Sequence, residues 1–172
     1  MTEPTPVDSK QFRQVMRKFA TGVTVLTVRD GERIHGMTAN AFTSVSLDPM
    51  LALACIAKNT VTHEMVLRAG IFAVNILSES QREWARRFAH QVTAPSNPFA
   101  DIAYHFAATG SPILDDGIAY LDCHVIAAHD AGDHTIFVGR VQAAGFGNTQ
   151  DENPLLWFNG RYTSLASHDH NS

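Results

Sequence analysis

Extended, strand-like runs separated by short turn segments fill the second half of the chain, and this pattern limits the possible folds more than any other feature. The runs lie at 104–106, 118–129 and 135–146, and clusters of Gly, Pro and Asp separate them. The first half adds similar runs but only a few segments with helical spacing. Because strands and helices do not alternate regularly, we expect a mainly β chain with attached helices, built as an antiparallel barrel or sandwich rather than a doubly wound parallel sheet.

Three helices are predicted. The first follows Asp8-Ser9, where apolar residues recur at i, i+3, i+4 and i+7 over 12–19, so one face should pack on a core. The second covers 61–67 and ends at Gly70, a plausible C-cap. The third begins at the capping-box pattern 78–81 and lasts to about residue 90. The segment 91–101 contains two prolines and is expected to be an exposed loop.

The first half also predicts strands. Asp30-Gly31 separates β-branched residues at 22–28 from a second run at 33–35, which favours a hairpin. The runs 51–57 and 71–76 are apolar almost throughout, which indicates strands buried on both sides. Cys55 and Cys123 lie inside such runs, so both are expected to be reduced and buried.

Length, charge and hydropathy limit the class of protein. A chain of 172 residues with 45% hydrophobic residues suits one domain at 9–166, with a disordered segment at 1–8 and a polar tail at 167–172. The net charge of −4 argues against a nucleic-acid partner. The longest apolar run falls short of the roughly 20 residues that span a bilayer. With no apolar core of a secretory signal, we expect a cytoplasmic protein that binds no membrane.

The segment 36–46 combines small residues with hydroxyl and amide side chains. Small side chains let a flat ligand approach the backbone, and polar groups there suit a heteroaromatic edge. The polar residues are Thr38, Asn40, Ser44 and Ser46. The alternative is a polar strand and turn whose hydroxyls satisfy their own backbone.

Two segments could hold a phosphate. Lys58-Asn59-Thr60 precedes the second predicted helix and offers a cation, a hydroxyl and free backbone N–H groups. The alternative is an ordinary N-cap at Asn59 or Thr60 beside an exposed lysine. Arg86-Arg87-Phe88 could clasp a phosphate or stack on a ring, although a charged helix face beside a core phenylalanine gives the same pattern.

Gly132-Asp133-His134 stands at the tip of a predicted hairpin, where the histidine could contact a redox ligand or simply be exposed. His124, His129 and His134 alternate between the faces of a strand, so no metal site is assigned. The chain has no GxSxG, P-loop or strand-linked GxGxxG motif. The sequence therefore lacks the motifs typical of α/β-hydrolases, of P-loop nucleoside triphosphatases and of Rossmann dinucleotide-binding domains.

Three segments stand out together: 19–27, the stretch from Gly36-Met37-Thr38-Ala39-Asn40 to Asp48-Pro49, and 131–139. In order and spacing they resemble the short-chain flavin reductase family, the NAD(P)H:flavin oxidoreductases that serve as reductase components of two-component flavin-dependent monooxygenases. The resemblance covers about 9–166. It implies an FMN-binding split β-barrel, a Greek-key antiparallel barrel, in a homodimer with the flavin near the interface. The family's usual Asp-Pro-Pro is here Asp48-Pro49-Met50.

The resemblance also implies site residues, matched motif by motif. The isoalloxazine edge would be lined by Thr38, Ala39, Asn40, Ser44, Val45 and Ser46, and the ribityl chain by Cys55, Ile56 and Ala57. The phosphate would lie at Lys58, Asn59 and Thr60, with a second flavin contact at Arg87, Phe88 and Ala89. The nicotinamide side would comprise Gly132, Asp133, His134 and Tyr162. His134 is the expected catalytic residue, which would orient the nicotinamide or compensate charge on the reduced flavin.

The expected function is therefore NAD(P)H-dependent reduction of FMN or FAD, with reduced flavin passed to a partner monooxygenase. One alternative is a flavin-carrying binding protein without nicotinamide turnover, and another is a flavoprotein reductase of ferric iron or a corrinoid. FMN and FAD are not distinguished, and no arginine cluster evidently dedicated to a 2′-phosphate is visible, which favours NADH over NADPH. Because the domain is small, both ligands should share one pocket that a second subunit completes.

Overall fold

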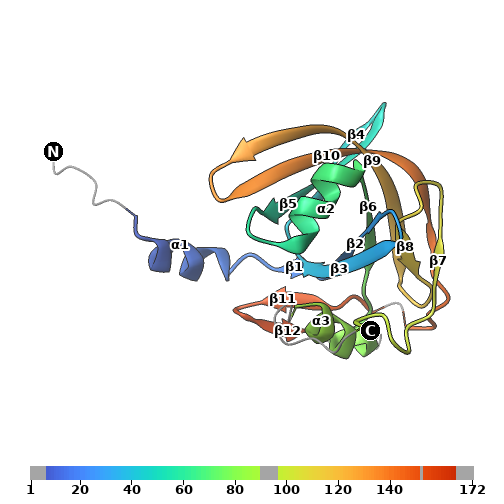
Figure 1. The fold of residues 1–172 in the computed structure, drawn as a ribbon. Coiled ribbons are helices and arrows are strands. Elements are labelled where there is room, and N and C mark those ends of the chain that lie inside the picture. Colours follow the sequence, from blue (N-terminus) through green and yellow to red (C-terminus); the bar gives the residue numbers. More distant parts are fainter. Residues whose placement is uncertain (1–6, 90–96, 152, 166–172) are drawn as a thin grey trace, which may run out of the picture.

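A seven-stranded antiparallel sheet forms the body of the molecule (Figure 1). The computed structural model describes residues 7–89, 97–151 and 153–165. The order in the sheet is β3-β2-β6-β9-β10-β5-β4. Its strands are β2 (Thr24–Asp30), β3 (Arg33–Ala39), β4 (Phe42–Leu47), β5 (Met50–Ala57), β6 (Ile71–Ile76), β9 (Ala119–Ala131) and β10 (His134–Phe146). The predicted mainly antiparallel architecture is confirmed, and so is the hairpin at Asp30-Gly31, where Asp30 pairs with Arg33.

Two small sheets accompany the large one. One joins β1 (Thr21–Gly22), β11 (Leu156–Phe158) and β12 (Arg161–Thr163), and the other joins β7 (Tyr104–Phe106) and β8 (Pro112–Leu114). The hairpin of β11 and β12 was not predicted. It brings the C-terminal part of the chain against β1 near the start of the domain.

The helices begin and end close to the predicted residues. They are α1 (Ser9–Met16), α2 (Val61–Ala69) and α3 (Arg82–Ala89), and a 3-10 turn, η1 (Glu79–Gln81), leads into α3. Asp8 caps α1 and Thr60 caps α2, while Gly70 ends α2 in the left-handed conformation that glycine adopts readily. None of the helices among the described residues has both the length and the apolarity needed to cross a membrane.

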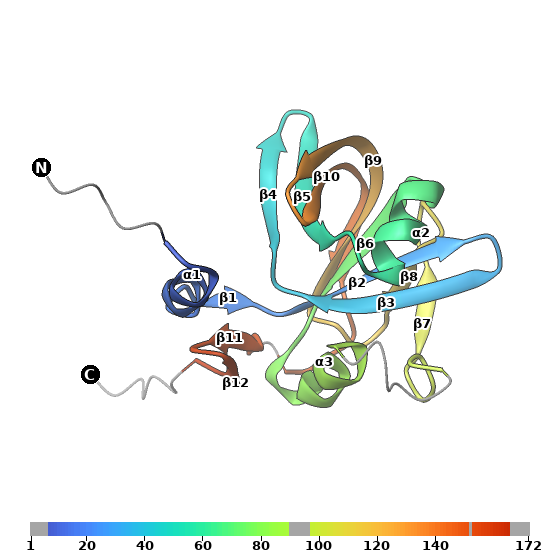
Figure 2. The same ribbon diagram turned by 60° about the vertical axis from the view of Figure 1, so that its left-hand side comes forward.

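The two end strands of the large sheet, β3 and β4, follow one another in sequence. Only Asn40 and Ala41 connect them, although five strands lie between them in the sheet order. The sheet must therefore curl until its ends meet at these two residues, as Figure 2 shows. We call this junction, residues 40–41, the seam.

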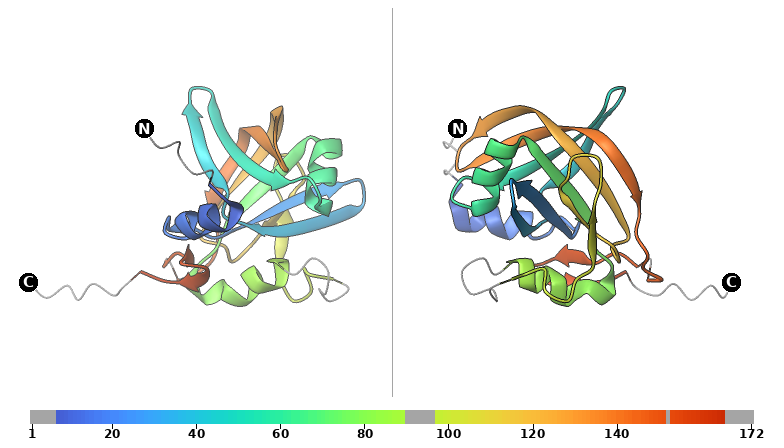
Figure 3. Two further views of the ribbon diagram at one scale, coloured as in Figure 1. Left: turned by 90° about the vertical axis from the view of Figure 1, so that its left-hand side faces the viewer. Right: turned by 45° about the vertical axis from the view of Figure 1, so that its right-hand side comes forward.

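β2 is buried on both faces because it lies between two apolar cores. Leu26 and Val28 pack in the first core with Met65 and Val66 of α2, and with residues of β5, β6 and β10. Val25 belongs to the second core, which includes residues of α3 and the 99–102 turn. The helices α2 and α3 consequently lie on opposite sides of the β2–β3 hairpin (Figure 3).

Three sequence expectations were wrong. The apolar stripe of α1 does not pack on a core: Phe12, Val15 and Phe19 are 59%, 63% and 66% exposed, because the helix extends away from both cores. The strand at 51–57 is buried on one face only, since Ala52, Ala54 and Ile56 point inward while the alternate side chains are half-buried. Cys55 lies on that second face and is half-buried, whereas Cys123 is buried as expected.

Parts of three expected segments lie outside the described residues. These are the N-terminal segment 1–8, of which residues 7 and 8 are described, the tail 167–172, and the loop 91–101, of which 97–101 forms a turn. The 97–101 turn contributes Phe99 to the second core.

Candidate functional site

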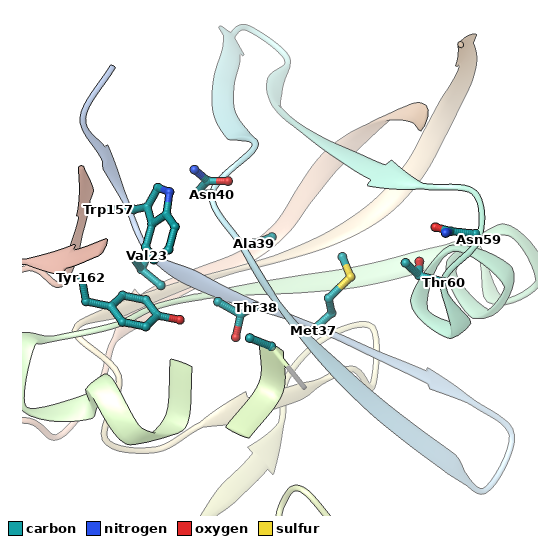
Figure 4. A pocket seen from close by; sticks show the side chains of 10 residues that line it. Val23, Met37, Thr38, Ala39, Asn40, Asn59, Thr60, Trp157 and Tyr162 are labelled. Atoms are coloured by element: carbon teal, nitrogen blue, oxygen red, sulfur yellow. The ribbon is translucent and has the colours of Figure 1, made fainter. Parts of the chain in front are cut away.

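A cavity of about 570 Å³ opens beside the seam (Figure 4). This volume lies within the usual range for sites that hold a small organic ligand, about 300–1,000 Å³. Four parts of the fold meet there: the end of β3, the start of α2, the end of α3, and the β11–β12 hairpin. The lining residues are Val23, Met37, Thr38, Ala39, Asn40, Asn59, Thr60, Ala89, Trp157 and Tyr162.

The end of β3 forms one wall of the cavity. β3 is an edge strand, so the backbone groups on its outer side pair with no other strand among residues 7–89, 97–151 and 153–165. The Thr38 hydroxyl donates a hydrogen bond to the carbonyl of Ala85 at 2.6 Å, and the Asn40 amide donates to the Thr21 hydroxyl at 3.1 Å. Since these side chains hold the strand in place, the free backbone is the natural partner for a ligand here.

The start of α2 forms the opposite end of the cavity. The Thr60 hydroxyl accepts a hydrogen bond from His63 N at 3.2 Å and donates to the carbonyl of Ala57 at 2.8 Å. A second contact fixes the helix, because His63 Nε2 lies 2.8 Å from the Thr135 hydroxyl on β10. The first N–H groups of α2 and the positive end of its dipole therefore favour an anion beside Asn59 and Thr60.

Trp157 and Tyr162 form an aromatic wall. Their rings meet edge to face, with centroids 5.0 Å apart, as paired strands of the β11–β12 hairpin place them. Burial raises the pKa of Tyr162, and nearby Arg86 opposes that effect. The phenol is thus a neutral hydrogen-bonding group beside an apolar indole, which suits the face or edge of a flat ring.

The segment 87–89 divides between the cavity and the core. Ala89 lines the cavity. Arg87 donates a hydrogen bond to the carbonyl of Ala100 at 2.6 Å, and its side chain is partly exposed. Phe88 is buried edge to face against Phe99, with centroids 5.1 Å apart, so its ring belongs to the second core.

The expected residues on β4 and β5 do not line the cavity of a single chain. Ser44 and Val45 are exposed on β4, and Ser46 is half-buried. Ile56 points into the first core, while Cys55 and Ala57 are half-buried on the other face of β5. Burial raises the pKa of the Cys55 thiol.

The turn at 132–134 lies beside the loop at 58–60. Lys58 N donates to the carbonyl of Asp133 at 3.0 Å, and Lys58 Nζ donates to the carbonyl of Gly132 at 2.7 Å and pairs with Asp130. His134 pairs with Ala57 across the ladder. The turn therefore adjoins the cavity's anion end without lining it.

His134 and Asp133 form a hydrogen-bonded pair. His134 Nδ1 lies 2.7 Å from the Asp133 carboxylate, and this bond holds the pKa of Asp133 below its usual range. Asp133 thus remains an acceptor at neutral pH, which fixes a proton on Nδ1 and leaves Nε2 for a ligand.

The other two histidines of this hairpin lie farther along its ladder. His129 pairs with Ile136 and His124 with Arg140, which separates both from His134. In the parts of the chain that the structure describes, no group of three His, Cys, Asp or Glu side chains could hold a metal ion.

Sequence reasoning missed three lining residues: Val23, Met37 and Trp157. A signal existed for Trp157, since Asn159-Gly160 separates two short apolar runs and is a typical hairpin turn. Val23 and Met37 lie inside the segments 19–27 and 36–40 that carry the resemblance, but nothing in those segments distinguishes them as lining residues.

Fold and cavity together define a class of protein: a curled antiparallel sheet with a cavity suited to a flat ligand that bears a phosphate. Residues 16–166 match the family model described as "Flavin reductase like domain", and the chain belongs to that family.

Named relatives share most of their length with this chain. The flavin-dependent monooxygenase reductase subunit HsaB of Rhodococcus jostii is 36% identical over 92% of this chain and 79% of its own length. The NADH-dependent flavin reductase StyB of Pseudomonas fluorescens is 39% identical over 91% and 89%. The solved structure of flavin reductase PheA2 superposes with a TM-score of 0.84 at 40% identity, covering 94% of this chain and all of that one.

Proposed function

We propose that this chain is an NADH-dependent flavin reductase that supplies reduced FMN or FAD to a partner monooxygenase. One observation carries the proposal: a single cavity joins a free strand edge, an aromatic wall and a helix N-terminus in a chain of the flavin reductase family. The names of HsaB and StyB support the monooxygenase partner and the choice of NADH. Bound flavin supplies the chemistry, which is acceptance of a hydride from the nicotinamide.

We infer one orientation for the flavin in this cavity. The free backbone edge at Thr38, Ala39 and Asn40 would bind the polar edge of the isoalloxazine, with Trp157 and Tyr162 beside the ring. The phosphate would lie at Asn59 and Thr60, at the N-terminus of α2, where the first backbone N–H groups of a helix lack partners within the helix. Lys58 joins them when its ammonium group exchanges the exposed Asp130 carboxylate for the phosphate.

His134 would act on the nicotinamide side. Asp133 holds its Nδ1, so Nε2 can orient the nicotinamide or, when protonated, compensate charge on the reduced flavin. Hydride transfer needs the two rings in contact and needs little acid–base help, so the role of the chain is to position both rings and exclude water.

We also infer that the curled sheet is a split barrel and that the protein is a homodimer in the cytoplasm. β3 and β4 meet at the seam without pairing, which is how a barrel with one open side is built. Ser44, Val45, Ser46 and His134 do not line the cavity of one chain. Val45, Leu47 and Met50, on the β4–β5 hairpin, are exposed apolar residues, with Leu47 91% exposed, so we infer that a second copy covers this hairpin and completes the site.

Sedimentation of the wild-type chain and of Leu47→Glu tests the dimer. The molecular mass measured for the wild type should be twice that of one chain. L47E should be largely monomeric and should reduce flavin more slowly. A wild-type monomer that reduces flavin at full rate would contradict the dimer without affecting the proposed reaction.

The reaction is tested with the purified chain, NADH, and FMN or FAD, by following loss of NADH absorbance without oxygen. NADH should be consumed in proportion to the flavin reduced. Flavin binding without NADH consumption would instead identify a flavin carrier. Flavin retained through gel filtration, with turnover of a ferric or corrinoid acceptor and none of free flavin, would identify a reductase of that acceptor.

A further inference from the structure

Lys58 is held against the tip of the β9–β10 hairpin rather than in the cavity. Its ammonium group donates to the carbonyl of Gly132 at 2.7 Å and forms an ion pair with the Asp130 carboxylate. A third contact, from Lys58 N to the carbonyl of Asp133 at 3.0 Å, fixes the backbone of the lysine to the same tip. Lys58 is therefore not among the residues that line the cavity, although the two residues that follow it are.

The sheet register places Asp130 on the face that carries α2. Asp130 pairs with Thr135 across the β9–β10 ladder, and the side chains of paired residues lie on the same face of a sheet. The Thr135 hydroxyl lies 2.8 Å from Nε2 of His63, in the first turn of α2. The Asp130 carboxylate is thus on the same side of the sheet as the α2 N-terminus, where the proposed function places the flavin phosphate.

The ion pair between Asp130 and Lys58 is weak enough for a ligand to break. The Asp130 side chain is 81% exposed and that of Lys58 is 39% exposed, so solvent screens the two charges. Asp130 is nevertheless ionised at neutral pH, because its hydrogen bond and charge interaction with Lys58 hold its pKa below the usual range. A phosphate at the start of α2 can therefore replace the carboxylate as the partner of Lys58.

We propose that Asp130 competes with the flavin phosphate for Lys58 and thereby limits both the affinity and the bound lifetime of the flavin. The proposal rests on the proposed function, because a reductase that supplies reduced flavin to another enzyme must also release it. Binding of the phosphate breaks the ion pair, and the pair forms again when the flavin leaves, which stabilises the empty site. Asp130 is thus a positioning residue that acts through Lys58 and touches neither substrate.

Equilibrium binding of FMN and of riboflavin, without NADH, tests the competition. Asp130→Asn removes the competing charge, so FMN should bind about two- to fivefold more tightly, the range expected for loss of an exposed ion pair. Riboflavin carries no phosphate, so its binding should not change. Dissociation of FMN, followed by stopped-flow fluorescence, should slow by a similar factor, because related complexes differ in affinity mainly through their dissociation rates.

Three controls separate this competition from a general effect of charge. Asp130→Glu keeps the negative charge at the same position and should bind FMN as the wild type does. Glu32→Gln removes an exposed carboxylate from the β2–β3 turn, at a residue outside the cavity, and should leave FMN binding unchanged. In a chain that already carries Lys58→Ala, Asp130→Asn should have no further effect on FMN binding, because the two residues act as a pair.

Several results would overturn the proposal. Unchanged FMN affinity and dissociation in D130N would show that the ion pair does not oppose flavin binding. An equal gain from D130N with and without K58A would show direct repulsion of the phosphate, and an equal gain for FMN and riboflavin would show a change in the cavity itself. A wild-type chain that binds FMN in the expected way but consumes no NADH in its presence would instead contradict the proposed reaction alone.

Discussion

Gly36 is the position where one added methyl group should most directly disturb the cavity. It lies on β3 beside the lining residue Met37, and its surroundings are closely packed. A Cβ atom there would lie 2.7 and 2.8 Å from two carbons of the Phe88 ring and 3.3 Å from the Phe99 ring. Both rings are buried in the second core, so Gly36→Ala must push α3 away from β3.

The expected cost follows from two opposing effects. Overpacking a buried site costs about 1–3 kcal/mol. Replacing glycine by alanine in a compatible backbone stabilises by about 0.4–1 kcal/mol, because the unfolded chain loses freedom. The net loss therefore lies between about 0 and 2.6 kcal/mol, which lowers the melting temperature by up to about 10 °C in a domain of this size.

Urea and thermal unfolding of three variants measure this loss. Gly22→Ala is the matched control, since nothing lies within 4 Å of its Cβ position, and it should be as stable as the wild type or slightly more stable. Phe88→Leu combined with G36A should recover part of the loss, so the two changes should not be additive. If G36A were as stable as G22A, β3 and α3 could not be in the contact described here.

Three further predictions concern the site and the thiols. Lys58→Ala with Thr60→Ala should weaken FMN binding about tenfold and leave riboflavin binding nearly unchanged, since only FMN carries a phosphate; equal losses for both would remove the phosphate role. His134→Ala should lower kcat/KM for NADH by about 3–10-fold, and unchanged steady-state constants would show that His134 has no part in the reaction. Burial, with the charge of Asp122, raises the pKa of Cys123 from 9.0 to about 12, so a thiol reagent near neutral pH should modify at most one cysteine in the folded chain and two after unfolding. The Cys123 thiol ionises at lower pH in the unfolded chain than in the folded one. The free energy of unfolding should therefore fall as the pH rises from 9.0 to about 12, and Cys123→Ala should remove the share of this decrease that comes from Cys123.

Most helices and strands could be predicted from short sequence patterns, because neighbouring residues determine where they begin and end. Asp30-Gly31 turns a hairpin and Gly70 ends a helix through backbone conformations that those residues adopt readily. The apolar stripe of α1 shows where this reasoning stops. Periodicity indicates that a helix has an apolar face, but it does not say whether that face meets a core of the same chain.

The site could be predicted only in part for a similar reason. Thr38, Asn40 and Thr60 belong to short motifs that the sequence displays directly, and the structure brings them to one cavity. Ile56 and Phe88 belong to such motifs too, but the strand and helix periods turn their side chains into the cores. Trp157 reaches the cavity only because β11 pairs with β1, a contact between residues more than a hundred positions apart in sequence.

The seam also affects how motion is distributed in this molecule. β3 and β4 are not hydrogen-bonded to each other, although Asn40 and Ala41 connect them in sequence. The two strands can therefore move apart without breaking a backbone hydrogen bond between them. Within the described part of the chain no strand pairs with the outer edge of β3 or of β4, so solvent supplies the hydrogen bonds at these edges. A molecule bound beside the seam joins the two ends of the sheet, and amide protons along β3 and β4 should then exchange more slowly than in the free protein, while those of the central strands β6 and β9 change little.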